Sequence, residues 1–308
     1  MRLIALVIAA AMLGILTAST ADGQDANYSR EGADSCLSCH EDDAVVLAVF
    51  KGAHANPTDP NGPFGHGQLQ CEACHGPSGD HAGRVRRGQE RPAPGAIFGD
   101  DSPTPVATQN GFCIDCHSAD TGFGWHGNDH DLNEIACTDC HSSHVAKDPV
   151  LVTATQPEVC FDCHQQQRTQ SLKPYAHPIR QGKMDCGSCH STHGATNDLQ
   201  LVQQTLNDTC FDCHAEKRGP YLWEHAPVAE DCGNCHDPHG SNHSGMLSMR
   251  GPMLCQSCHS QAGHPSVPAD GDGLPDAMPS QFMLGQNCMN CHTQSHGSNH
   301  PSGSRLMR

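Results

Sequence analysis

The sequence predicts an extended array of short α-helices and irregular loops, with little or no β-structure and no ordinary hydrophobic core. Three observations predict this fold class. Apolar residues make up 36% of the 308 residues and aromatic residues 4%, below the apolar content of about 45–50% in globular domains. The chain holds 31 Gly and 21 Pro, which shorten regular elements. It also holds 20 Cys and 24 His, so groups bound by these residues must supply the missing buried mass.

The N-terminus is typical of a secretory signal peptide. Arg2 precedes an uninterrupted apolar stretch over residues 3–16, and small residues follow up to Ala21. This order predicts cleavage after Ala21, so residues 1–21 are the signal peptide and residues 22–308 the exported protein. An uncleaved anchor is the alternative, but the apolar run is short for a membrane span.

Every Cys belongs to one of ten Cys-x-x-Cys-His motifs. Two thiols at this spacing can form thioethers with one porphyrin, and the His that follows becomes the proximal iron ligand. Disulfides do not require a His after each second Cys, and zinc sites need two separated ligand pairs. The sequence therefore predicts a multihaem cytochrome c with ten covalently bound haem c groups. The predicted thioether residues are Cys36, Cys39, Cys71, Cys74, Cys113, Cys116, Cys137, Cys140, Cys160, Cys163, Cys186, Cys189, Cys210, Cys213, Cys232, Cys235, Cys255, Cys258, Cys288 and Cys291. The predicted proximal ligands are His40, His75, His117, His141, His164, His190, His214, His236, His259 and His292.

The other 14 His recur in register with these motifs. Motifs without a nearby following His alternate with motifs followed by one, as in CHxxH, and at least one more His lies between the two kinds. Each repeat thus holds two motifs and two further imidazoles, enough for a second ligand on each iron. The five repeats span 36–81, 113–144, 160–193, 210–239 and 255–296. The predicted distal ligands are His54, His81, His130, His144, His177, His193, His225, His239, His264 and His296. The choice stays open between His54 and His66, His126 and His130, His239 and His243, and His296 and His300.

The CHxxH spacing predicts links between haems. The second His lies only three residues after the first, so it cannot easily reach the opposite face of the same iron, and we expect it to bind a different one. The Met residues show no once-per-repeat placement, so we expect them to pack rather than to bind iron. Two His ligands on every iron leave no open position, which favours electron transfer without catalysis.

The chain divides approximately into two five-motif halves, 36–164 and 186–292. The longest stretch without a motif is 82–112, which contains Arg84, Arg86, Arg87 and Arg91. We interpret this basic cluster as a solvated surface loop rather than a docking patch. The formal net charge of −17 excludes nucleic acid as a partner.

The segment 71–81 (CEACHGPSGDH), the CHxxHG segments and the closing segment 296–303 (HGSNHPSG) resemble the decahaem MtrA/DmsE family over nearly the whole exported chain. This resemblance implies a periplasmic cytochrome associated with the outer membrane through a β-barrel porin. It also implies a periplasmic or inner-membrane cytochrome as electron donor and an extracellular multihaem cytochrome or terminal reductase beyond the porin, in extracellular respiration or oxidation. Each half also resembles the pentahaem donor to periplasmic nitrite reductase.

Two alternatives remain. A multihaem oxidoreductase enzyme would need a five-coordinate haem, often marked by an altered motif such as CxxCK, whereas all ten motifs are intact. A subunit of an extracellular haem filament should borrow a ligand from its neighbour, whereas the ligand count closes within this chain. The sequence leaves open the direction of electron flow, the terminal acceptor or donor, and the spatial order and individual potentials of the haems.

Overall fold

The computed structural model describes residues 27–99, 101–121, 124–259 and 288–307, so the predicted signal peptide and His264 lie outside the described residues. The chain divides into two compact bodies. The N-terminal body comprises Met1–Leu47 and His54–Ile97, and the C-terminal body comprises Ala48–Ala53 and Phe98–Arg308. Most of the first repeat lies in the N-terminal body, and the other four lie in the C-terminal body.

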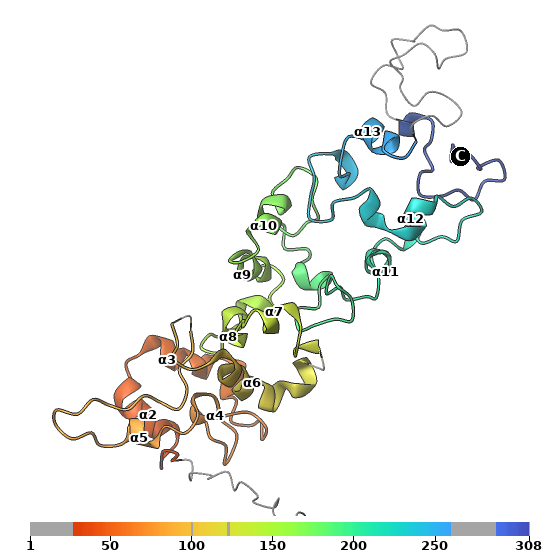
Figure 1. The fold of residues 1–308 in the computed structure, drawn as a ribbon. Helices are drawn as coiled ribbons and strands as arrows, with labels where there is room; N and C mark the ends of the chain where they lie inside the picture. Colours follow the sequence, from red (N-terminus) through yellow and green to blue (C-terminus); the bar gives the residue numbers. More distant parts are fainter. Residues whose placement is uncertain (1–26, 100, 122–123, 260–287, 308) are drawn as a thin grey trace, which may run out of the picture. The chain divides into compact units, whose positions relative to one another are not determined.

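The described elements are short helices (Figure 1). The α-helices are α2 (Ala33–His40), α3 (Ala44–Ala48), α4 (Glu72–His75), α5 (Gly79–Ala82), α6 (Val106–Thr121), α7 (Asp129–Leu132), α8 (Cys137–Cys140), α9 (Gln156–Phe161), α10 (Gln165–Ser171), α11 (Leu206–Phe211), α12 (Ala226–Glu230) and α13 (Gly251–Gln256). The 3₁₀-helices are η1 (Val49–Lys51), η2 (Ala53–Ala55), η4 (Pro149–Leu151), η5 (Cys186–Ser188), η6 (Ala215–Lys217), η7 (Cys232–Asn234), η8 (Ser244–Met246) and η10 (Cys288–Asn290). In the described part of the chain, β-structure is limited to isolated bridges. The predicted fold class is confirmed.

Each haem-attachment motif forms about one helical turn. In the second motif of repeat 3, for example, the backbone N–H of His190 donates to the carbonyl of Cys186 at 2.9 Å. Residues at positions i, i+3 and i+4 share one helix face, so this turn brings both thiols and the imidazole to the same side. The first motif of each repeat lies on or at the end of an α-helix, whereas the second motif of repeats 3 to 5 begins a 3₁₀-helix.

Few side chains form a core. Among the described residues, no large side chain is fully buried. The buried hydrophobic residues are Ala33, Val49, Ala96, Trp125, Ala136, Phe161 and Leu201. Such a set cannot by itself offset the conformational entropy of ordering a chain of this length. The structure therefore needs another source of buried apolar surface, as the composition predicts.

Backbone contacts link successive repeats of the C-terminal body. Tyr175 of repeat 3 forms an antiparallel bridge with Ser241, just after repeat 4, and Trp223 of repeat 4 forms one with Ser298, just after repeat 5. Within the described ranges, no helix is both long and apolar enough to cross a membrane.

Candidate functional site

Imidazole rings face one another in seven pairs, each joining a predicted proximal ligand to a predicted distal ligand. The ring centroids lie 5.9 to 6.4 Å apart. The pairs are His40 with His81, His164 with His130, His141 with His193, His214 with His177, His190 with His239, His259 with His225 and His236 with His296.

The separation of the rings fits one metal atom between them. A metal–imidazole bond is about 2 Å long and the centroid lies about 1 Å behind the ligating nitrogen, so two imidazoles on opposite faces of one iron have centroids about 6 Å apart. The rings of His236 and His296 are 6.1 Å apart with an interplanar angle of 8°, and those of His130 and His164 are 6.2 Å apart at 78°. The distance is thus kept while the ring orientation varies, which is expected of a shared metal rather than of ring stacking.

The six pairs in the C-terminal body cross from one repeat to the next. The mid-repeat His pairs with the first proximal candidate of the following repeat, as His177 does with His214. The second His of a CHxxH segment pairs with the second proximal candidate of the preceding repeat, as His239 does with His190. The partner of His141 is thus His193 rather than the nearby His144, which supports the expectation that a CHxxH segment binds two irons.

The mid-repeat imidazoles are oriented by backbone carbonyls of the next repeat. Their Nδ1 atoms lie within hydrogen-bond distance of the carbonyl just before the second His of CHxxH. The distances are 3.3 Å from His130 to Thr192, 2.8 Å from His177 to Pro238 and 2.9 Å from His225 to Ser295. Because a carbonyl can only accept, Nδ1 carries the proton and Nε2 keeps its lone pair for a metal. Each of these residues therefore contacts the next repeat at both ring nitrogens when iron is bound.

In the second motif of each repeat, the proximal candidate is oriented by a hydrogen-bond acceptor that lies later in the chain. The Nδ1 atoms of four of them face carbonyls: Ala96 at 3.1 Å from His75, Leu199 at 3.1 Å from His190, Gly245 at 2.7 Å from His236 and Arg305 at 2.8 Å from His292. His141 differs, because its Nδ1 lies 2.7 Å from a carboxylate oxygen of Asp148. A carboxylate partner makes an imidazole a stronger electron donor to a metal than a carbonyl does.

The surroundings of the alternative imidazoles differ in two of the open choices. The side chain of His126 is 74% exposed with its Nδ1 3.9 Å from Asp131, whereas its rival His130 pairs with His164. The Nδ1 of His300 accepts the N–H of Ser302 at 3.2 Å, so its proton is on Nε2, the atom that an iron would need. In contrast, His296 pairs with His236, and burial lowers the pKa of His296 and of His239. A lowered pKa favours the neutral imidazole that binds metals.

All of the candidate haem ligands stay predictions. The proximal candidates His75 and His292 are oriented by Ala96 and Arg305, as above, and His117 lies at the kink inside α6. Of the other distal candidates, His54 and His144 lie within the described residues and His264 lies outside them.

The thiols of neighbouring motifs lie close together. All twenty are free of disulfides. Within a repeat, the two first thiols share a hydrogen bond, which raises the pKa of Cys36 and lowers that of Cys71 to about 7. The same contact joins Cys113 to Cys137, Cys160 to Cys186, Cys210 to Cys232 and Cys255 to Cys288. Between repeats the second thiols are neighbours, since the charge of Cys213 helps burial to raise the pKa of Cys189 and that of Cys258 does so at Cys235. In the C-terminal body the motifs therefore follow one another in space in their sequence order.

Sequence reasoning missed residues that position the motifs. The buried Asn207 accepts the N–H of Cys232 at 2.7 Å and donates to the carbonyl of Val228 at 3.0 Å. Asn110 makes the equivalent bond to Cys137 at 2.7 Å. Both stand three residues before the first Cys of their repeat, a spacing that could have been noticed. Gly194 and Gly240 follow the second His of two CHxxH segments. A Cβ on Gly240 (φ 134°) would collide with the carbonyl oxygen of Gln170 in the preceding repeat.

One unpaired polar atom supports the fit of haem. The indole Nε1 of Trp125 is buried without a hydrogen-bond partner, and the ring packs edge-on against His193 at 6.2 Å. A buried donor of this kind costs stability unless an acceptor reaches it, and haem bound at the His141–His193 pair has carboxylates that can serve.

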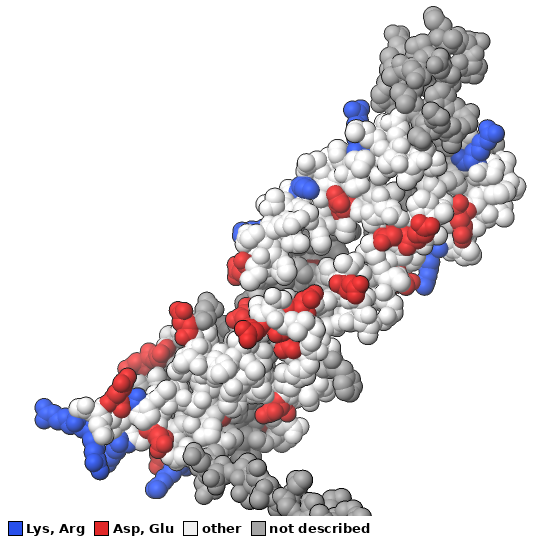
Figure 2. All heavy atoms as spheres, viewed as in Figure 1, with Lys and Arg blue, Asp and Glu red and all other residues white. Residues whose placement is uncertain are grey.

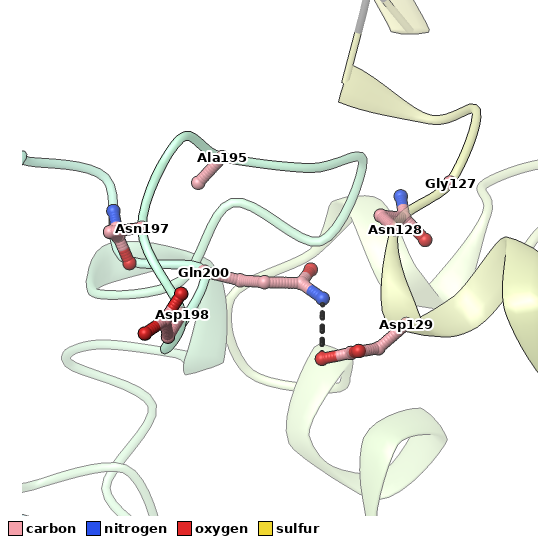
Figure 3. A pocket seen from close by; sticks show the side chains of 7 residues that line it. All are labelled: Gly127, Asn128, Asp129, Ala195, Asn197, Asp198 and Gln200. Carbon is pink, nitrogen blue, oxygen red and sulfur yellow. Dashed lines mark hydrogen bonds between the residues drawn. The ribbon is translucent and has the colours of Figure 1, made fainter.

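A polar hollow of about 290 Å³ lies in the C-terminal body (Figure 3). It is lined by Gly127, Asn128, Asp129, Ala195, Asn197, Asp198 and Gln200. Gln200 crosses it to Asp129, with Nε2 3.1 Å from the carboxylate. The lining has no His or Cys, and no group of three metal-binding side chains occurs within the described ranges. The hollow is a polar contact between repeat 2 and the segment that follows repeat 3, and we assign no ligand to it.

The sequence is similar to those of known proteins. Residues 177–219 and 225–264 match the family described as doubled CXXCH motif, and residues 71–156 match the family described as cytochrome c-type protein NrfB-like. The chain is 46% identical over 286 residues to the multiheme cytochrome MtrA of Shewanella baltica, covering 92% of this chain and 84% of that protein. It is 29% identical over 177 residues to the cytochrome c-type protein NrfB of Escherichia coli, covering 54% of this chain and 86% of that protein. The two doubled-motif matches both begin at a mid-repeat His, so each spans a junction between repeats.

Proposed function

The chain belongs to the MtrA family of multihaem c-type cytochromes, and from this premise we propose that it transfers electrons along ten covalently bound haem c groups. The haem groups would supply one-electron chemistry at iron, and the protein supplies their attachment, axial ligands and spacing. The twenty thiols at the ten motifs hold the porphyrins. The His of each motif and one distal His hold each iron.

We assign the seven observed imidazole pairs as the axial ligands of seven irons. The Nδ1 contacts of His130, His177 and His225 support the assignment, because they leave Nε2 available. His54, His144 and His264 are the distal ligands proposed for the other three irons. With two imidazoles at every iron, no position remains for a substrate, which favours electron transfer over the enzyme alternative.

The observation that carries the proposal is the register of the pairs. In the C-terminal body, each of the six pairs joins two successive repeats. The thiol contacts place neighbouring motifs side by side in chain order. Repeats joined at every junction hold their haems at fixed spacing, which electron transfer over many sites requires.

We further propose that the protein works on the periplasmic side of the outer membrane, inserted in a β-barrel porin. The predicted export and the identity to MtrA over most of both chains support this location. The partners would be a periplasmic or inner-membrane cytochrome on one side and an extracellular multihaem cytochrome or terminal reductase on the other.

The haem count is tested by the mass of the intact protein isolated from the periplasm. Ten haem additions and no free thiol are expected. A fully occupied protein with nine or fewer additions would contradict the assignment.

The conduit is tested in liposomes that contain reduced methyl viologen and carry the haem-loaded protein with a candidate outer-membrane porin. Ferric citrate added outside should oxidise the enclosed dye only when both proteins are present. Equal oxidation with the porin alone, or none with both, would rule out the conduit.

A further inference from the structure

The loop after α5 presents four exposed arginines. This arginine loop, residues 82–95, contains Arg84, Arg86, Arg87 and Arg91. Its tip is a turn in which the N–H of Gln89 donates to the carbonyl of Arg86 at 3.0 Å and Gly88 has φ 88°. The tip therefore displays its arginines on an ordered turn rather than on a free strand.

Both ends of the loop are bonded to proposed iron ligands. The guanidinium of Arg91 donates to the carbonyl of His81 and, at 3.0 Å, to that of Gly83. The Nδ1 of His81 in turn faces the carbonyl of Pro92 at 2.8 Å. At the far end, the N–H of Ala96 donates to the carbonyl of His75 at 2.7 Å. A molecule that binds the loop would thus lie beside the iron held by His40 and His81.

The charge of the loop is opposite to that of the rest of the protein. Four of the 17 Lys and Arg lie within residues 84–91, in a chain of net charge −17. In Figure 2, Lys and Arg atoms gather where Figure 1 draws the loop after α5. Among the described residues, Arg84, Arg86 and Arg87 form no ion pair with a carboxylate. Three guanidinium groups are therefore free to bind one.

We propose that the arginine loop is the docking surface for an acidic redox protein that exchanges electrons with the haem at the His40–His81 pair. This inference rests on the proposed electron-transfer function and replaces our interpretation of the cluster as a merely solvated loop. In the reducing direction one electron passes from the reduced partner to ferric iron at this pair, and the partner is oxidised by one electron. No bond forms or breaks.

Electrostatics makes this location selective for such a partner. An acidic protein is repelled by a surface of net negative charge and attracted only where positive charge gathers, which steers it during diffusion. Arginine binds carboxylates with two parallel hydrogen bonds, so the loop also orients what it attracts. Anionic lipid shares part of this chemistry, but anchorage of the loop at an iron-ligand pair favours a partner that carries an electron.

The test measures reduction of the haem-loaded protein by reduced plant-type ferredoxin, an acidic iron–sulfur protein, in a stopped-flow instrument. The loop variant is R84Q/R86Q/R87Q, which keeps Arg91. The control is K147Q/R180Q/K183Q, which removes the same number of exposed charges from the C-terminal body. Dithionite reduction first establishes equal haem content in all three proteins.

At about 10 mM ionic strength, the loop variant should react about tenfold more slowly than wild type, and this difference should shrink at about 200 mM, where exposed charges are screened. The control should stay within about twofold of wild type. Equal rates for the loop variant and wild type, or equal losses in both variants, would overturn the proposal. It would also be overturned if phosphatidylglycerol vesicles bound wild type better than the loop variant while ferredoxin reduced both equally. Failure of the liposome assay would instead reject the conduit and leave this rate comparison intact.

Discussion

In the N-terminal body His81 pairs with His40 of its own repeat, whereas its counterpart His239 in the C-terminal body pairs with His190 of the preceding repeat. The same position in the repeat thus closes the array at one end and links repeats farther along. His81 and His40 belong to one repeat, whereas His239 and His190 belong to two successive repeats. The difference teaches that the partner of the second His in a repeat depends on which repeats pack beside it.

The comparison is tested most strongly by removing these two imidazoles. His239→Ala and His81→Ala should each leave one haem high-spin and able to bind carbon monoxide in the reduced protein. Only His239→Ala should also speed proteolysis between repeats 3 and 4, by about tenfold, because it removes an iron bond between them. Carbon monoxide titration and limited proteolysis measure the two effects.

The control is His300→Ala, since the Nδ1 of His300 accepts a backbone N–H. It should bind no carbon monoxide. The comparison would break if His81→Ala loosened the C-terminal body as much as His239→Ala does.

The next largest effect is on stability, at the close approach between Gly240 and the backbone of Gln170. Gly240→Ala would place a Cβ against the backbone of Gln170, with the backbone held at φ 134°. We expect a loss of about 3 kcal/mol in stability, seen as a lower melting temperature in the circular dichroism of the haem band. Gly111→Ala in α6 meets no atom within 4 Å and should instead raise stability by up to about 1 kcal/mol. Equal melting temperatures for Gly240→Ala and wild type would contradict the close approach of Gly240 to Gln170.

The amides that position the motifs differ between the two bodies. Asn207→Ala leaves the N–H of Cys232 and the carbonyl of Val228 without their partner in a buried site, so we expect a loss of about 2 kcal/mol. In the N-terminal body, Gln70 accepts the N–H of Ala33 at 2.5 Å, and only that bond is lost in Gln70→Ala, at about 1 kcal/mol. Chemical denaturation of the haem-loaded variants measures both. The reverse order of the two losses would contradict this assignment.

The smallest expected effect is on the midpoint potential of one haem. Asp148→Asn keeps a hydrogen-bond acceptor near His141 but removes the negative charge, which weakens electron donation to iron. One haem should therefore rise in midpoint potential, on the order of 50 mV. Asp198→Asn removes the same charge from the polar hollow and serves as the control in a spectroelectrochemical titration. Equal shifts in the two variants would show that Asp148 acts only through net charge.

The sequence predicted the fold class because many Gly and Pro shorten regular elements, and because the many Cys and His indicate bound groups in place of an ordinary hydrophobic core. It predicted candidate ligands because CxxCH chemistry is local. It could not predict which His meets which, since the separation from His177 to Pro238 depends on how one repeat packs on the next. The role of Asp148 could not be predicted either. A carboxylate seven residues after a His contacts its ring only if the chain between them turns back, and the sequence does not indicate that turn.

We infer that, in the C-terminal body, successive repeats share the irons held at the six imidazole pairs. A cryo-EM map of the haem-loaded protein tests it directly, because density shows which thioethers and which imidazoles belong to each porphyrin. We predict that the Nε2 of His239 is bonded to the iron whose porphyrin is attached at Cys186 and Cys189. A bond from His239 to the iron of the porphyrin attached at Cys232 and Cys235 would contradict it.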